Sequence, residues 1–333
     1  MRVQQALQAP FELGGTEVYV SGSVGVSVFP IDAEDVGALL KNADAAMFRS
    51  KKAGPGGFVL HATNDAEAMN KLSLSTRLRK AVESKSWMLH YQPVIAIEDR
   101  TMLGVEALIR WQEPNGGLVP PGDFIPLAEE MGLIEAIGDW VVEEICRQDS
   151  AWRAQGISTE ISFNLSPRQL WQPDLVAKIV SRLLAAGIEP GRVVAEITES
   201  TAMTDPDRTQ QVLLDLHARG LRLALDDFGT GYSSLARLKH MPVDVLKIDR
   251  SFIRDVDTDH DAQSMVSAMI ALASNLGMTA LAEGIETEGE RRFLVDRGCP
   301  LGQGFLFSKP VPAEDIPAFY HRAGLQLIEG EAG

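Results

Sequence analysis

The chain has 333 residues, 45% of them hydrophobic, and carries 31 Lys and Arg against 46 Asp and Glu, so its formal net charge at pH 7 is −15. This length and composition are those of a globular protein that can bury a large core without disulfides or metal staples. The negative charge repels polyanions, which argues against a nucleic-acid polymer as a partner, and an anionic small ligand would need metal ions or local basic residues to bind.

The first part of the chain combines strand and helix patterns. Residues 18–29 place valines at alternate positions, which predicts strand, and residues 32–56 show a helical pattern that opens with acidic residues and closes with Gly-Pro-Gly. Residues 64–86 repeat apolar side chains every four positions, which predicts an amphipathic connecting helix. The expected division is a first segment over residues 1–62, a linker helix over 63–86 and a main domain over 87–325.

In the main domain, short apolar segments alternate with segments of helical length, which indicates parallel βαβ units in a barrel or a long open sheet. Only four residues separate the apolar runs 88–97 and 102–110, and a connection of that length cannot join parallel strands. We therefore expect a (βα)-type barrel with one antiparallel strand. The seven candidate strands that alternate with helices are residues 103–110, 160–165, 192–198, 221–227, 244–250, 278–286 and 300–307.

Polar side chains stand at the carboxyl ends of these strands, where α/β barrels bind their ligands. A lone strand-end Asp is more often a helix cap than a ligand, and a lone Lys usually keeps its head in water. Seven successive strands that end in such groups predict a shared site, whose negative charge cations must offset. The residues are Glu106, Asn164, Glu196, Glu199, Asp226, Asp227, Lys247, Asp249, Glu283, Glu286 and Gln303.

These side chains also predict a class of chemistry. Oxygen ligands without His or Cys favour Mg²⁺ or Mn²⁺ over zinc, and the adjacent carboxylates of Asp226 and Asp227 suit a pair of ions. Metal pairs of this kind drive in-line phosphoryl chemistry, in which Lys247 would orient water or offset the phosphate and Arg110 would contact a phosphate or base. A barrel glycosidase fits less well, because it needs one isolated acid pair.

Seven motifs, in this order and spacing, closely resemble the EAL-domain family of bacterial cyclic-di-GMP phosphodiesterases: EALIR, FNLSP, EITES, DDFGTGYSSL, LKIDRSFI, AEGIE and GQGFLFSKP. The resemblance runs from about Leu74 to Phe319 and includes YQPVI and FIPLAEE. It implies a TIM-like (βα)8 barrel with one antiparallel strand, preceded here by a partial α+β segment and the linker helix. It also implies hydrolysis of cyclic-di-GMP to linear pGpG with two Mg²⁺ or Mn²⁺ ions.

The resemblance further implies a role for each matching residue. Lys247 matches the lysine that contacts water, and Glu199 matches the residue that holds the loop after the double Asp; with Glu106, Asp226 and Asp227 they form the expected catalytic set. The expected metal ligands are Glu106, Asn164, Glu196, Asp226, Asp227 and Glu283. The expected substrate-binding residues are Gln92, Leu108, Arg110, Pro126, Asp249, Glu286 and Gln303.

The first segment resembles the C-terminal half of a GGDEF domain, from SGSVGVSVFP through NADAAMFRSKKAG, without the half that bears the signature loop. We therefore expect no diguanylate cyclase activity from this chain. Every matched site position is kept, which favours an enzyme over a receptor that binds cyclic-di-GMP without turnover. EAL domains often pair, so the resemblance also implies a homodimer.

The remaining features bear on location. Cys146 and Cys299 are the only cysteines, and their separation predicts free thiols packed in the core. The most apolar stretches fall short of the roughly 18 residues that a membrane span needs, and the first residues do not resemble a signal peptide. We expect a cytoplasmic chain without membrane contact of its own, to which a natural parent protein could add sensor or membrane segments.

Overall fold

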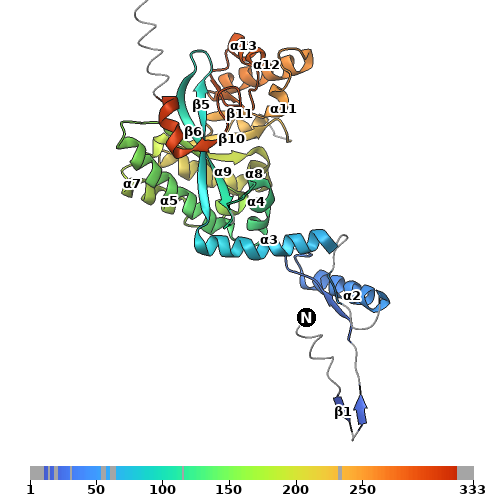
Figure 1. The fold of residues 1–333 in the computed structure, drawn as a ribbon. Coiled ribbons are helices and arrows are strands. Elements are labelled where there is room, and N and C mark those ends of the chain that lie inside the picture. The colour runs from blue at the N-terminus through green and yellow to red at the C-terminus, as the bar shows by residue number, and fades with distance from the viewer. Residues whose placement is uncertain are drawn as a thin grey trace, which may run out of the picture. The chain divides into compact units, whose positions relative to one another are not determined.

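The structure is a computed structural model in which residues 11–13, 16–18, 22–30, 32–53, 58–60, 65–114, 116–231 and 235–320 are described. The chain divides into two compact units, and Figure 1 shows their elements. The first unit comprises Met1–Ser84 with Gly122–Leu133, and the second comprises Lys85–Pro121 with Ile134–Gly333. Each unit is described by itself.

Within its described residues, the first unit contains two small sheets and three helices. One sheet pairs β1 (Phe11–Leu13) with β2 (Thr16–Val18) in antiparallel fashion, and the other pairs β3 (Val24–Val26) with β4 (Phe58–Leu60) in parallel. The predicted strand over 18–29 is therefore only partly present, and residues 19–21 lie outside the described residues. The helices are α2 (Val36–Ala53), α3 (Asp65–Ser84) and α4 (Pro121–Glu130). They confirm the helix expected after Pro30 and the connecting helix expected over 64–86.

A glycine allows β3 and α2 to pack closely. A Cβ atom on Gly25 would collide with the backbone of Ala43 and Met47 in α2. Only glycine lets a strand approach a helix backbone so closely without displacing it. Gly25, in the stretch SVGV of the predicted strand, thus allows the close contact between these two elements.

Eight strands of the second unit close into a barrel in the order β5, β13, β12, β11, β10, β9, β8 and β6, with β6 pairing back to β5. Neighbouring strands are parallel except at β5, which runs antiparallel to both β6 and β13. This confirms the predicted barrel with one antiparallel strand. The strands are β5 (Trp87–Ala96), β6 (Thr101–Gln112), β8 (Glu160–Asn164), β9 (Val193–Thr198), β10 (Arg222–Phe228), β11 (Val245–Ile248), β12 (Thr279–Ala282) and β13 (Leu301–Gly302).

Helices alternate with these strands along the chain and lie outside the barrel (Figure 1). The chain between α4 and α5 is not helical, because Gly132 adopts a left-handed φ of 71° and α5 begins only at Ile134. Two short strands, β7 (Leu118–Val119) and β14 (Val311–Pro312), extend the sheet beside β6 and β5. The helices of this unit are α5 (Ile134–Arg153), α6 (Pro167–Leu170), α7 (Leu175–Ala185), α8 (Glu199–Thr204), α9 (Pro206–Ala218), α10 (Leu235–Leu238), α11 (Arg250–Ile253), α12 (His260–Asn275) and α13 (Glu288–Asp296), with the 3-10 turns η1 (Pro190–Arg192) and η2 (Ala313–Asp315).

The last two barrel strands are much shorter than the apolar runs 278–286 and 300–307 predict. The segments that follow β12 and β13 remain joined by backbone hydrogen bonds outside the regular ladder. The N–H of Ile285 donates to Gln303 O at 3.1 Å, and the N–H of Leu306 donates to Ile285 O at 3.0 Å. A Cβ atom on Gly304 would collide with the Ile285 backbone. This close crossing replaces regular strand pairing at the carboxyl ends of β12 and β13.

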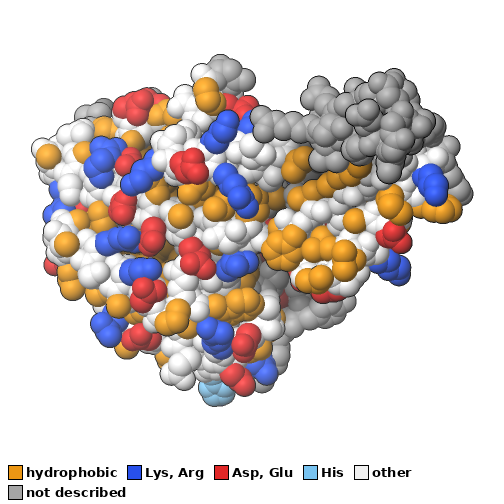
Figure 2. Space-filling view, turned by 90° about the horizontal axis from the view of Figure 1, so that it is seen from below, with side chains coloured by type: hydrophobic (Ala, Val, Ile, Leu, Met, Phe, Trp, Pro, Cys, Tyr) orange, Lys and Arg blue, Asp and Glu red, His pale blue; other side chains and the backbone are white. Residues whose placement is uncertain are grey.

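The distribution of surface charge and the burial of the two cysteines can be compared with what the sequence predicts. On the face drawn in Figure 2, acidic and basic side chains are interspersed, so the negative net charge does not gather there in one patch. Cys146 and Cys299 are buried free thiols, as predicted. Within the described residues, no helix combines the length and the apolar character needed to cross a bilayer.

Candidate active site

A buried ammonium group lies at the centre of the polar end of the barrel. Lys247 in β11 is 1% exposed, and its Nζ contacts four carboxylates. The distances are 2.5 Å to Glu196, 2.8 Å to Glu283, 3.2 Å to Asp226 and 3.5 Å to Glu106. These acids come from four different strands or strand ends, so barrel closure is what brings them together.

One ammonium group does not neutralise the negative charge of the carboxylates around it. Burial lowers the pKa of Lys247, but the carboxylates of Glu106, Glu196 and Glu283 outweigh it and hold that pKa well above its ordinary value. Burial raises the pKa of Glu196 to about 8, with a further increase from Glu106. Burial also raises the pKa of Glu283 to about 8, although Lys247 acts in the opposite direction. The site is therefore short of positive charge when its acids are ionised.

Side-chain amides fix the orientation of Glu106. Its Oε1 accepts from Asn164 Nδ2 at 3.0 Å, and its Oε2 accepts from Gln303 Nε2 at 2.9 Å. Gln303 Nε2 also donates to Gln92 Oε1 at 2.8 Å, and Gln92 Nε2 donates to Ser308 O at 3.1 Å. The Oε1 atom of Gln303 is buried without a hydrogen-bond partner among the described residues, which leaves one acceptor available inside the site.

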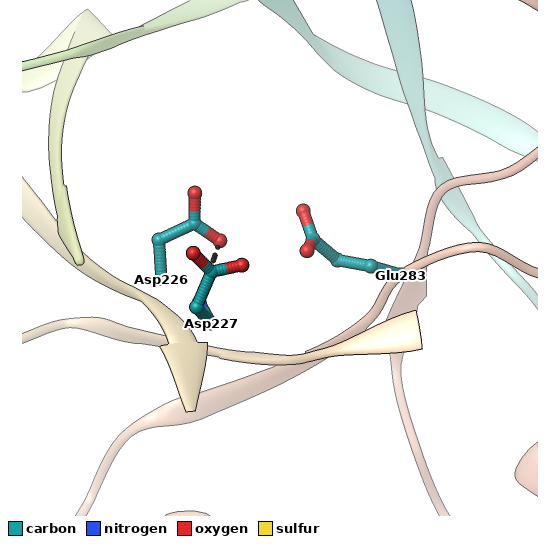
Figure 3. Close-up of side chains that lie close together, drawn as sticks. All are labelled: Asp226, Asp227 and Glu283. Carbon is teal, nitrogen blue, oxygen red and sulfur yellow. Dashed lines mark hydrogen bonds between the residues drawn. The ribbon is translucent and has the colours of Figure 1, made fainter. Parts of the chain in front are cut away.

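The double Asp at the end of β10 presents both carboxylates to the same side. Side chains alternate across an extended strand, but Asp227 has a φ of 55°, and its N–H donates to Asp226 Oδ1 at 2.9 Å. Oxygen atoms of Asp226, Asp227 and Glu283 lie within 4.8 Å of one another. Figure 3 shows the three carboxylates close together. Burial raises the pKa of Asp227, and the charges of Asp226 and Asp249 add to the increase. This trio is an all-oxygen set that suits a divalent cation.

Glu199 holds the start of the loop that follows the double Asp. It is the first residue of α8 and is 1% exposed. Its Oε2 accepts from the backbone N–H groups of Gly229 at 2.8 Å and Gly231 at 3.3 Å. Residues 232–234, the Tyr-Ser-Ser of the loop, lie outside the described residues.

The remaining predicted residues lie on β6, just after β11, after β12 and on α4. Leu108 and Arg110 continue the inward face of β6 beyond Glu106, paired with β5. Asp249 caps α11 by accepting at 2.9 Å from the N–H two residues further on, and Glu286 follows β12. Pro126 lies inside α4, in the other compact unit.

Each of the eight barrel strands, or the residue that directly follows it, supplies one member of the central network. Seven of these residues were expected at strand ends, and Gln92 was expected from the YQPVI motif. The eight are Gln92, Glu106, Asn164, Glu196, Asp226, Lys247, Glu283 and Gln303.

Two residues that position site groups were not predicted from the sequence. Ser308 acts through its backbone carbonyl, so its residue type gives no signal. Glu290 accepts from the N–H groups of Glu286 at 2.7 Å and Thr287 at 2.9 Å and so fixes the backbone beside the predicted Glu286. Thr287 and Glu290 form a capping box, a pattern that the letters TEGE display.

Comparison with known families decides the classification. The model of the EAL domain matches residues 75–310. The chain belongs to the EAL domain family. A second model, described as diguanylate cyclase, GGDEF domain, matches residues 1–56, so GGDEF sequence precedes the EAL domain as the resemblance implied.

Relatives of this EAL protein are named for cyclic-di-GMP metabolism. MucR of Pseudomonas aeruginosa, a bifunctional diguanylate cyclase/cyclic di-GMP phosphodiesterase, is 42% identical over 319 residues, which are 95% of this chain and 47% of MucR. The cyclic di-GMP phosphodiesterase PdeR of Escherichia coli is 38% identical over 322 residues, 96% of this chain and 49% of PdeR. The chain thus spans about half the length of these relatives.

Solved structures share the fold of this EAL domain. The PaMucR phosphodiesterase in complex with c-di-GMP has a TM-score of 0.70 and 45% identity, and the match covers 73% of this chain and 99% of that one. The EAL enzyme Bd1971, in a form with cAMP and cyclic-di-GMP bound, has a TM-score of 0.76 and 30% identity, and the match covers 87% of this chain and 77% of that one.

Proposed function

We propose that this EAL domain is an enzyme that hydrolyses cyclic-di-GMP to linear pGpG with the aid of two divalent cations, Mg²⁺ or Mn²⁺. The observation that carries the proposal is the convergence of acidic side chains on Lys247 at the carboxyl ends of the barrel strands. The names of MucR and PdeR support the choice of substrate. In the reaction, the oxygen of water bonds to phosphorus, the bond from phosphorus to the 3′ oxygen breaks, and a proton from water ends on that oxygen.

The donor set fits two divalent ions. Five carboxylates face one ammonium, so the ionised cluster carries four excess negative charges, which two divalent cations would balance. Bound ions would polarise a phosphoryl oxygen and lower the pKa of a bound water. We assign metal binding to Glu106, Asn164, Glu196, Asp226, Asp227 and Glu283.

The chain's own groups would orient the reactants. The buried Lys247 keeps its charge, so it can hold a water by hydrogen bonding and offset negative charge on the phosphate. Glu199 holds the backbone after the double Asp in place. We assign substrate contacts to Gln92, Leu108, Arg110, Pro126, Asp249, Glu286 and Gln303.

A direct assay tests the proposal. The purified chain is incubated with cyclic-di-GMP and Mg²⁺ or Mn²⁺, beside a sample with EDTA, and the products are separated by chromatography. We expect metal-dependent pGpG, and we expect Asp226→Asn to lower the rate at least about 100-fold because it removes a ligand charge. Asp207→Asn, at a side chain that is 98% exposed, is the matched control and should leave the rate unchanged. Tight binding of cyclic-di-GMP without product would instead identify a receptor.

We also propose the division into a GGDEF-like segment over 1–62, a linker helix over 63–86 and an EAL barrel over 87–325, and we propose that the chain forms a homodimer. A shorter chain of residues 63–325 should then keep the hydrolysis. Light scattering at the assay concentration should give twice the mass of one chain, and a fully active monomer would contradict the dimer.

A further inference from the structure

The barrel interior contains a second hollow, toward the N-terminal ends of the strands. It is a cavity of about 360 Å³ whose walls include the apolar core cluster of Val194, Ala224, Val245 and Leu281. An apolar cavity of roughly 150 Å³ is large enough to take up benzene. The space below the acidic cluster is therefore sufficient for a molecule with at least one six-membered ring.

The cavity opens at the N-terminal ends of β8 and β10. Glu160 and Arg222 line it there, with 41% and 30% of their side chains exposed. The inner end is formed by Glu196 and Lys247, which also belong to the candidate active site. The cavity thus reaches the central ion pair from the side opposite to the strand ends that carry Asp227 and Glu283.

Each end of this cavity holds an ion pair. Arg222 contacts Glu160 at 2.5 Å at the mouth, and Lys247 contacts Glu196 at 2.5 Å at the inner end. An anionic ligand would lose its hydration on entry and would meet the excess negative charge of the carboxylates around Lys247, and a cationic ligand would face the Lys247 and Arg222 side chains themselves. The cavity therefore favours an uncharged occupant.

One polar atom in the wall lacks a partner. Ser162 lies on the inward face of β8 between Glu160 and Asn164, is 7% exposed, and lines the cavity. Its Oγ is buried and has no hydrogen-bond partner among the described residues. A buried hydroxyl without a partner is unfavourable, so the occupant should carry one group that can bond to it.

We propose that this cavity is a binding site for a small neutral molecule that is apolar over most of its surface and carries a single hydroxyl-type group, which bonds to Ser162. The apolar walls bind its hydrocarbon part, and the excess carboxylate charge at the inner end excludes anions. The proposal concerns binding alone and does not depend on the hydrolysis proposed above.

Benzyl alcohol serves as the probe, with toluene as the same ring without the hydroxyl and benzoate as a charged counterpart. Binding to the whole chain is measured by ligand-observed NMR and by the shift in thermal unfolding. We expect benzyl alcohol to bind with a Kd of the order of 1 mM, toluene more weakly, and benzoate not at all. Ser162→Ala should weaken benzyl alcohol about 2- to 12-fold and leave toluene unchanged, which corresponds to one hydrogen bond.

Two further variants locate the site. Ala224→Leu should abolish binding of both neutral probes, because it fills the cavity. If that variant does not fold, Gly104→Ala adds a methyl to the same wall, where its Cβ meets Glu160 atoms at 3.4 Å and Val94 at 3.8 Å, which are ordinary contacts, and binding should weaken. Ser181→Ala, on the exposed side of α7, is the control that should change nothing.

The proposal is overturned if benzyl alcohol at about 10 mM fails to bind the wild-type chain, as would happen if water fills the cavity and is not displaced. It is also overturned if the folded wall variants bind benzyl alcohol as tightly as the wild type, because the probe would then sit elsewhere. Equal binding of benzoate and benzyl alcohol would refute the argument that the charged inner end excludes anions.

Discussion

Replacement of Lys247 by methionine tests whether the ammonium offsets the charge of the acidic cluster. The side chain is 1% exposed and contacts four carboxylates within 3.5 Å, so the substitution leaves buried acids without their cation. Removal of one partner from a buried ion pair costs about 3–5 kcal/mol of stability. We expect a loss of that size in the free energy of unfolding at pH 8.5 in EDTA, together with loss of hydrolysis.

The pH dependence of this loss has a definite sign. In the native state the pKa of Glu196 and of Glu283 is about 8 even with the ammonium present, against an ordinary 4.5, and without the ammonium it lies higher still. Because the native state then binds more protons than the unfolded state, stability falls as pH rises through this range and returns as pH falls. The difference between Lys247→Met and wild type should therefore shrink at pH 6.

Denaturant unfolding of metal-free protein at pH 6 and pH 8.5 measures both effects. Lys178→Met is the control, because that lysine is 40% exposed on α7 and pairs only with an exposed Asp174, so its midpoint should match the wild type. If Lys247→Met unfolds at the same denaturant concentration as wild type at pH 8.5, the ammonium does not compensate the acids and the electrostatic account is wrong.

Three further changes test other parts of the site. Gln303→Leu removes the amide that orients Glu106, and we expect about a 10- to 100-fold loss of rate or metal affinity, measured by turnover and by Mn²⁺ titration. Glu199→Ala frees the backbone N–H groups of the loop, so turnover should fall and amide exchange at Gly229 and Gly231 should accelerate. Cys146 and Cys299 are buried, and burial raises their pKa to about 11 and about 12, so a thiol reagent such as DTNB should label neither in the native protein at pH 8 and both in denaturant.

Each of these expectations has a clear contrary result. Wild-type turnover in Gln303→Leu would show that Glu106 needs no amide support. Unchanged exchange at the loop glycines in Glu199→Ala would show that another group holds the loop. Rapid labelling of one thiol in the native protein would show that the structure around that cysteine opens on the timescale of the reaction.

The barrel and its one antiparallel strand could be predicted from local features of the sequence. Apolar runs alternate with amphipathic segments, and the four-residue connection Glu98–Thr101 is too short for a parallel crossover. The polar strand ends could be predicted as a group because parallel strands end at one edge of the sheet. These properties depend on local patterns, which one sequence displays.

Features that depend on closure of the barrel could not be predicted in the same way. No local pattern shows that Lys247 meets acids 141 positions earlier and 36 later, because that distance is set only when the sheet closes. The left-handed φ of Asp227 places two adjacent carboxylates on one side, which contradicts the alternation expected of a strand. The short length of β13 follows from the crossing of Gly304 over Ile285, a contact between distant segments.

The hairpin that opens the barrel has a consequence for biosynthesis. Because β5 pairs with β13 and β14, and Gln92 is bonded to Ser308 and Gln303, the earliest strand of the ring waits for the last part of the domain to be translated. A nascent chain in which these residues have not been synthesised lacks Gln303, which bonds to Glu106 and Gln92, and Ser308, which bonds to Gln92. The hydrolysis proposed above therefore requires the last part of the domain, and a chain that ends before Gln303 should lack it.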